Sequence, residues 1–188
     1  MCEFESRFFL DLDMSFFFRI FAKPLAYCRL GKPDKLKIMG RITEITKKQA
    51  IARSCERATA ALPQTAAGAL FTVTGKILVV DIIGEVTTVI ETQANATKLV
   101  ANPTVGADVD MCATLDITAK AVGSTMNITG TLANAMVNVP GGAGVAQAGR
   151  LIVHGGTIDL DCAASNTGAI KWTLHWIPID ATADVVAA

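Results

Sequence analysis

Five aspartates in the second half of the chain are the side chains best suited to bind a metal ion. They form two groups, Asp108, Asp110 and Asp116 in one and Asp159 and Asp161 in the other. Residues i and i+2 of a strand share a face, so Asp159 and Asp161 could bind a hard cation such as Ca²⁺ together. The residue spacing of a dedicated calcium loop is absent. A solvated outer strand face is therefore the favoured interpretation, and we predict no metal site.

Two histidines and two tryptophans are the other side chains that could recognise a ligand. His154 and His175 have no motif partner for nucleophilic or metal chemistry. Trp172 and Trp176 stand four residues apart in the segment KWTLHW, so on one strand their indoles share a face. With His175 they are candidate contacts for a glycan or a protein partner. Core packing is the more common use of such aromatic residues.

The sequence contains none of the short motifs that mark common catalytic sites. GxSxG, GxxxxGK[ST], HExxH and GxGxxG are all missing. The glycine-rich stretch over residues 141–149 lacks the preceding strand and following helix that a phosphate-binding loop needs. We therefore predict a protein that is not an enzyme and that needs no cofactor.

The cysteines are odd in number and widely spaced, and no CxxC pair occurs among them. They are Cys2, Cys28, Cys55, Cys112 and Cys162. Zinc sites of the usual kind need closely spaced ligand pairs. The pattern predicts reduced thiols, with Cys112 and Cys162 as small core residues. A disulfide between these two is the less favoured alternative.

Composition points to a body that is covered by neighbouring subunits. Apolar residues make up 51% of the chain and charged residues 18%, against about 25% charged in ordinary globular domains. Extensive apolar surface of this kind is normally buried between subunits.

The net charge of zero hides an asymmetry between the two ends of the chain. Residues 1–57 carry twelve Lys or Arg and seven Asp or Glu, whereas the remainder carries five and ten. This predicts a basic arm whose simplest partner is the acidic body of a neighbouring copy. The candidate arm contacts are Lys47, Lys48, Arg53 and Arg57. Nucleic acid is the less favoured partner.

The first 62 residues form an N-terminal extension that differs in composition from the rest. Seven of the eight phenylalanines lie before residue 40, interrupted by charged residues that argue against a signal peptide and a membrane span. Two interpretations remain open: these phenylalanines dock on a partner, or residues 1–38 precede the natural start at Met39. Good helix formers over residues 44–60 predict one helix.

Residues 63–188 predict an all-β domain, an antiparallel β-sandwich or jelly roll. Short alternating or apolar segments recur at the spacing of such folds. Residues 109–118 show the clearest alternation, and Gly155 and Gly156 predict a tight turn between two strands. The expected strands cover residues 69–74, 76–83, 85–92, 97–101, 109–118, 125–130, 131–139, 150–154, 157–162 and 169–177.

Residues 65–188 resemble the small structural proteins of tailed bacteriophages and related viruses. The resemblance rests on GEVTTVIETQANATKLVANPTVGADVDMCATLDI, NITGTLANAM, GTIDLDCAASNTGAIKWTLHWIPID and the ending DVVAA. It carries no catalytic motif. It implies a virion component that is present in many copies on a capsid or tail.

These observations lead to a functional expectation. We expect a non-enzymatic virion structural protein, a capsid decoration or tail component, that forms a homo-oligomer such as a trimer and contacts other virion proteins. It would be assembled in the host cytoplasm, and no membrane is involved. The alternative is a carbohydrate- or receptor-binding module at a virion tip, for which Trp172 and Trp176 would have to be exposed.

Overall fold

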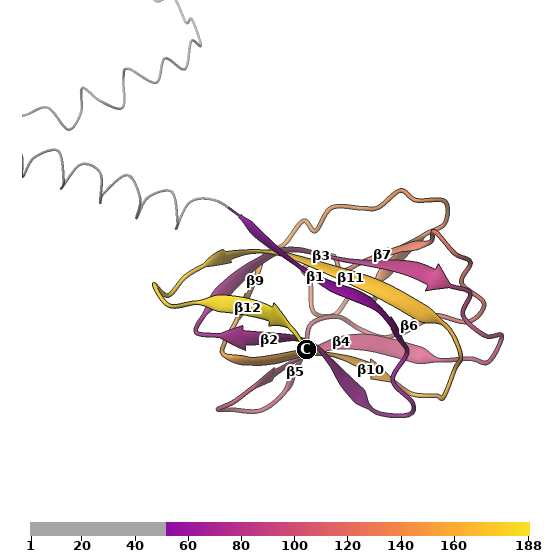
Figure 1. The fold of residues 1–188 in the computed structure, drawn as a ribbon, viewed down its shortest axis with the longest axis horizontal. Coiled ribbons are helices and arrows are strands. Elements are labelled where there is room, and N and C mark those ends of the chain that lie inside the picture. The colour runs from indigo at the N-terminus through magenta and orange to yellow at the C-terminus, as the bar shows by residue number, and fades with distance from the viewer. Residues whose placement is uncertain (1–51) are drawn as a thin grey trace, which may run out of the picture. The chain divides into compact units, whose positions relative to one another are not determined.

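The computed structural model describes residues 52–188, which form a sandwich of two antiparallel sheets (Figure 1). The first sheet has the order β1 (Arg53–Ala61), β11 (Ala169–Pro178), β3 (Ile77–Thr88), β7 (Thr125–Asn127), β8 (Val137–Val139), and β9 (Leu151–Val153) also pairs with β3. The second has the order β12 (Asp184–Ala187), β2 (Ala67–Thr74), β10 (Gly156–Cys162), β4 (Ala96–Pro103), β5 (Val109–Asp110), and β6 (Leu115–Asp116) also pairs with β4. The predicted all-β sandwich is confirmed, whereas the jelly-roll alternative stays a prediction. Among the described residues there is no helix that could cross a bilayer.

The helix predicted over residues 44–60 is wrong in its second half, and its first half lies outside the described residues. From Arg53 onward the chain is strand β1, which pairs antiparallel with β11 from Arg53 opposite Trp176 to Ala61 opposite Ala169. The sandwich domain therefore includes β1, whereas the sequence predicted its start at residue 63. Pairing with the central sheet overrides the helix propensity of the Ala, Glu and Arg residues in this segment.

Two further predictions about strands are corrected. The strands predicted over residues 76–83 and 85–92 are one strand, β3, because Gly84 continues the ladder opposite Trp172. The strand predicted over residues 109–118 is broken into β5 and β6. The amide of Leu99 in β4 donates to the Cys112 sulfur at 3.4 Å rather than to a backbone carbonyl, so the ladder is interrupted there.

The segment that contains Gly155 and Gly156 does not make a hairpin. It carries the chain from β9, which pairs with β3 in the first sheet, to β10 in the second sheet. The turn was predicted in the right place, but its role is to cross between the two layers. This crossover closes one end of the space between the sheets.

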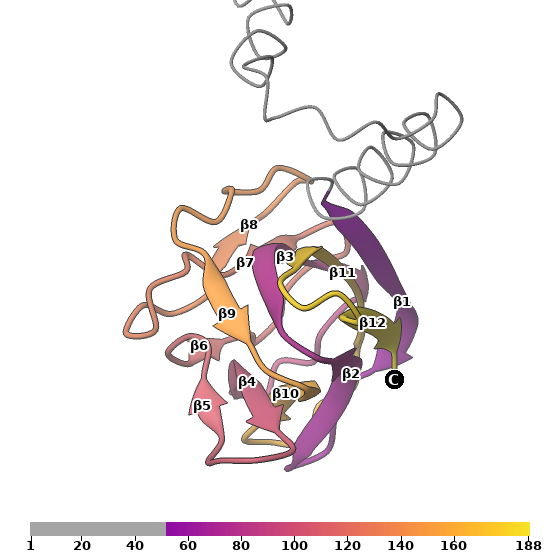
Figure 2. The same cartoon turned by 90° about the vertical axis from the view of Figure 1, so that its left-hand side faces the viewer.

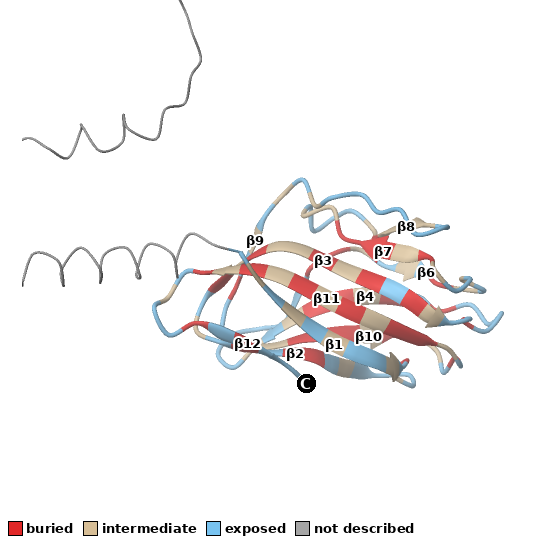
Figure 3. Ribbon diagram, turned by 45° about the horizontal axis from the view of Figure 1, so that its top comes forward, coloured by how far each residue is buried: buried red, intermediate tan, exposed pale blue. Residues whose placement is uncertain are grey.

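The core lies between the sheets and is organised around two tryptophans of β11. Alternate residues of β11 and β3 face inward, as the colours of Figure 3 show. Trp172 and Trp176 are only 1% and 2% exposed. A Cβ atom at Gly84 would lie 2.8 Å from the Trp172 ring, so the missing side chain makes room for the indole across β3. Burial of two indoles supplies much of the apolar driving force for packing the sheets.

The two long sides of the sandwich differ in how they are closed. On one side β1 of the first sheet and β12 of the second contact each other, and Figure 2 shows both strands at the right. On the other side lie β9 and β5, and each is paired along only one of its edges within residues 52–188. Figure 2 shows these two strands separated at the left. The sandwich is therefore closed along one side. On the other side, the bridge between Ala113 and Ala135 joins the two layers at one end, and the space between β5 and β9 is open.

Candidate interaction site

The open side of the sandwich contains an apolar depression of about 300 Å³. We call it the β5–β9 hollow. Buried Met111 and Val153, with Ala101 and Leu151, form its inner surface. The remaining lining residues come from the end of β4, the β4–β5 connection, β5, β9, the crossover after β9 and the loop before β8. They are Pro103, Val105, Gly106, Ala107, Val109, Leu132, Ile152 and His154.

The side chains at the rim of the hollow are apolar and strongly exposed to solvent. Val105 is 88% exposed, Val109 49% and Leu132 47%. These three are among the nine large apolar residues that are exposed within residues 52–188. Isolated exposed apolar residues are ordinary, but several around one depression are typical of an interaction surface.

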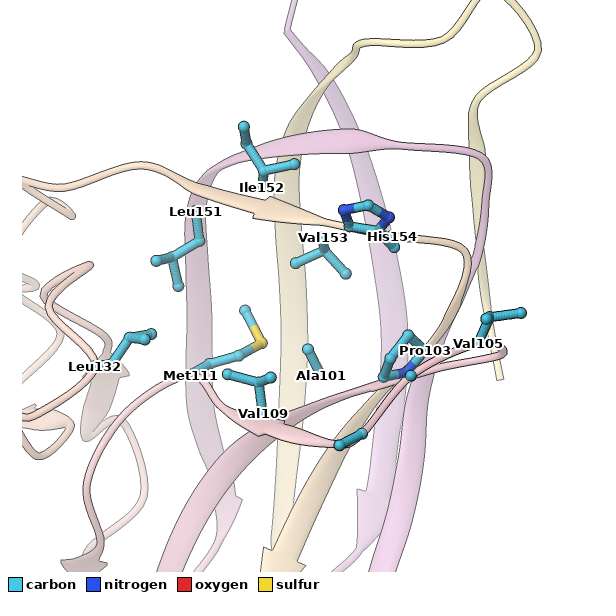
Figure 4. A pocket seen from close by; sticks show the side chains of 12 residues that line it. Ala101, Pro103, Val105, Val109, Met111, Leu132, Leu151, Ile152, Val153 and His154 are labelled. Atoms are coloured by element: carbon cyan, nitrogen blue, oxygen red, sulfur yellow. The ribbon is translucent and has the colours of Figure 1, made fainter.

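Figure 4 shows how the side chains are arranged around the space. Leu151 and Val153 point from β9 toward Met111 on the opposite wall, whereas Ile152 points away. The Thr104 amide donates to the Gly155 carbonyl at 2.8 Å, which ties the β4–β5 connection to the β9–β10 crossover. One end of the hollow is therefore fixed by backbone contacts.

The chemistry of the lining restricts what the hollow can bind. It contains no Asp, Glu, Lys or Arg, and His154 is its one titratable side chain. A charged ligand would lose water there without gaining a partner. Aliphatic and aromatic groups are the suitable ligands, and the flexible thioether of Met111 can adapt to their shape.

No protein-family model, curated protein or solved structure matches this chain.

The aromatic residues predicted as partner contacts do not form an accessible platform. Trp172 and Trp176 are core residues, so the structure contradicts their interpretation as a glycan-stacking surface. His175 is half-buried on the opposite face of β11, next to Asp81 of β3 and Ser54 of β1 in the sheet register. The three residues are thus divided between two faces of one strand. This division follows because successive side chains of a strand point to opposite faces of the sheet.

Of the four predicted arm contacts, Lys47 and Lys48 lie outside the described residues, and Arg53 and Arg57 lie within them. Arg53 and Arg57 are in β1, where they pair in register with Trp176 and Trp172 and share their face of the sheet. The Arg53 guanidinium lies over the Trp176 ring, 5.1 Å from its centre. The stems of both arginines cover the edge of the aromatic core, and the Nε atom of Arg57 is buried there without a hydrogen-bond partner among the described residues. Contact of either arginine with a neighbouring copy stays a prediction.

The aspartate groups are held by local structural contacts. On the second sheet, the Lys98 ammonium lies 2.8 Å from Asp110 and 3.9 Å from Asp161, and its hydrogen bond to Asp110 raises the pKa of Lys98. Asp159 is buried rather than on a solvated face as predicted: Asn102 donates to one of its carboxylate oxygens at 3.2 Å, and the other has no hydrogen-bond partner among the described residues. Within residues 52–188, no three His, Cys, Asp or Glu side chains gather closely enough to hold a metal ion.

Asp116 stabilises a turn. One of its carboxylate oxygens accepts hydrogen bonds from the Asn95 amide at 3.0 Å and from the amide and hydroxyl of Thr118. The hydroxyl of Thr118 is the main cause of the lowered pKa of Asp116. The carboxylate of Asp116 therefore holds the end of β6 against the start of β4.

The three described cysteines are free thiols. Cys112 and Cys162 are buried, as predicted, and the alternative disulfide between them is absent. Burial is the main cause of the raised pKa of both thiols, and it raises the pKa of half-buried Cys55 as well.

We expect Cys112 and Cys162 to resist alkylation in the folded protein. A raised pKa leaves less of the reactive thiolate at pH 8, and burial blocks access, so iodoacetamide should react at least about tenfold more slowly than in urea. Cys55 should react before either of them. Peptide mass spectrometry after timed alkylation measures this order, and equal rates in folded and unfolded protein would contradict it.

Sequence reasoning did not find the β5–β9 hollow. Its lining comes from separate parts of the chain that only the crossover and the sheet pairing bring together. The available signal was the segment from Pro103 to Val109, in which Val105 stands among turn-forming residues with no strand face to bury it.

Proposed function

We propose that the chain is a non-enzymatic structural protein that assembles with copies of itself through the open side of the sandwich. One observation carries the proposal: exposed apolar side chains surround an uncharged hollow between two edge strands, β5 and β9. Free strand edges and apolar patches both favour association with another chain. The charged-residue content of 18% is in keeping with a surface that is partly covered.

The setting that we propose for this assembly is a virion, with the chain as a capsid decoration or tail component. The support for it is the resemblance of residues 65–188 to structural proteins of tailed bacteriophages. A glycan-binding role is not favoured, because the two indoles that would have stacked on a sugar are in the core.

A matched pair of substitutions tests the role of the hollow in assembly. Val109→Ser removes an apolar group from the rim, and Val186→Ser makes the same change on β12, at the opposite edge of the same sheet. The two valines are similarly exposed, 49% and 54%. We expect Val109→Ser to weaken self-association at least about tenfold, since a buried valine contributes about 1.5 kcal/mol or more.

Light scattering across a dilution series measures both association constants. The control, Val186→Ser, should leave the constant within about twofold, in line with the small effects of surface changes. Equal effects of the two substitutions would show that association does not use the hollow.

The virion setting has its own test. Phage particles produced by a host that carries the gene are purified by density gradient and analysed by quantitative mass spectrometry. We expect peptides of this chain in a constant ratio to the major capsid protein. Particles that form normally and contain none of these peptides would refute a virion component while leaving self-association to be judged separately.

A further inference from the structure

The β5–β9 hollow has the properties of a receptor for phenyl rings. Its inner surface is aliphatic, its rim is uncharged apart from His154, and its volume is about 300 Å³. An apolar cavity of about 150 Å³ is enough to bind benzene. The hollow therefore has room for about two phenyl groups.

The chain itself contains a source of such groups. Residues 52–188 include one phenylalanine, Phe71, which is fully buried in the core. The other seven lie in the first 21 residues, and Phe16, Phe17 and Phe18 follow one another in the uncharged run MSFFF. Because the lining of the hollow offers no charged partner, it suits this uncharged aromatic run better than the charged sequence around Phe8 and Phe9.

The chain is long enough to carry these residues to a neighbour. In the first sheet, Arg53 of β1 lies opposite Trp176 of β11, and Trp176 lies opposite Val79 of β3. Val79 in turn lies opposite Leu151 of β9, which lines the hollow. Three strand spacings separate Arg53 from Leu151, about 14 Å. The 34 residues from 19 to 52 can span up to about 110 Å when extended. They can therefore bridge from one copy to the hollow of another.

We propose that the β5–β9 hollow receives two phenyl rings of the run Phe16, Phe17 and Phe18 from the N-terminal segment of a second copy. This inference rests on the proposed self-assembly, to which it adds the donor segment and the acceptor site. The phenyl rings bury the apolar inner surface of the hollow, and the free edge of β9 or β5 is available to pair with the donor backbone. Each copy both donates a segment and offers a hollow.

A photo-cross-linking experiment on the full chain tests the proposal. Phe17 is replaced by p-benzoylphenylalanine, and copies labelled with ¹⁵N are mixed with unlabelled copies before irradiation. Mass spectrometry then identifies each cross-linked peptide pair. We expect cross-links from residue 17 to peptides that contain Val109, Leu132 or Leu151, with labelled and unlabelled copies joined to each other.

Matched variants control for non-specific attachment of the photoprobe. Val109→Ser in the acceptor should reduce the cross-link yield several-fold, and Val186→Ser should leave it unchanged. In a chain without the photoprobe, replacing Phe16, Phe17 and Phe18 by serine should weaken self-association at least about tenfold.

Three different contrary results would overturn three different parts of this proposal. Cross-links only within single copies would overturn the exchange between copies. An oligomer whose cross-links map away from the hollow would overturn the inference but not the self-assembly. A chain that stays monomeric would refute the proposed function itself.

Discussion

Replacing Trp172 by alanine is expected to lower the free energy of unfolding by about 3–5 kcal/mol. The indole is 1% exposed and lies across β3 at Gly84, where a Cβ atom would be 2.8 Å from the ring. Loss of the ring leaves a cavity at the centre of the first sheet, and the surrounding strands are paired in ladders that limit collapse. This is the largest destabilisation that we expect from truncating one side chain.

Urea unfolding followed by circular dichroism measures this loss. Wild type and variant are compared at one protein concentration, because association would otherwise change the apparent stability. Val122→Ala, at an exposed position in a turn, serves as the control and should change stability by less than about 0.5 kcal/mol. A loss for Trp172→Ala as small as that of the control would mean that the indole is not in the core.

Replacing Gly156 by alanine is expected to cost about 2–6 kcal/mol, from backbone strain and overpacking together. Gly156 has φ near +153°, and a Cβ atom there would lie 2.2 Å from the Asn102 carbonyl oxygen and 2.6 Å from the Pro103 Cα. Both atoms belong to the backbone of β4, so no side-chain rotation can relieve the contact. β10 and β4 would have to separate at this end.

The same substitution should disturb the hollow. The Cβ atom would also lie 2.8 Å from the Thr104 amide, whose hydrogen bond to Gly155 fixes the end of the hollow. Gly142→Ala is the matched control, because φ is +79° and no atom lies within 4 Å of the added carbon. It should cost only the left-handed strain of about 1–2 kcal/mol. Thermal and urea unfolding compare the two, and equal losses would contradict the predicted clash.

Much of the fold could be predicted because strand alternation and turn chemistry are local signals. β11 follows the inward and outward pattern of KWTLHW, and the crossover occurs at the predicted glycines. β1 could not be predicted in this way, since Arg53 and Arg57 occupy inward positions that only their packing on Trp176 and Trp172 makes suitable. A pattern of apolar residues cannot identify a strand whose inner face is partly arginine.

The candidate site was harder to predict than the fold. Trp172 and Trp176 were candidate contacts because tryptophan side chains can bind ligands. Their burial depends on the second sheet, whose position the spacing of the two indoles does not predict. The hollow, by contrast, is made of ordinary aliphatic residues such as Val109 and Leu151. What makes them notable is the absence of a neighbouring strand at β5 and β9 within the described fold, which is a property of topology.

Self-assembly is the central claim, and the molar mass of the full-length chain in solution tests it most directly. Sedimentation equilibrium over a wide concentration range gives that mass without reference to a standard. We expect a mass that is a multiple of the 19.8 kDa of one chain and that falls toward this value on dilution or with Val109→Ser. A mass of 19.8 kDa at every concentration would contradict the claim.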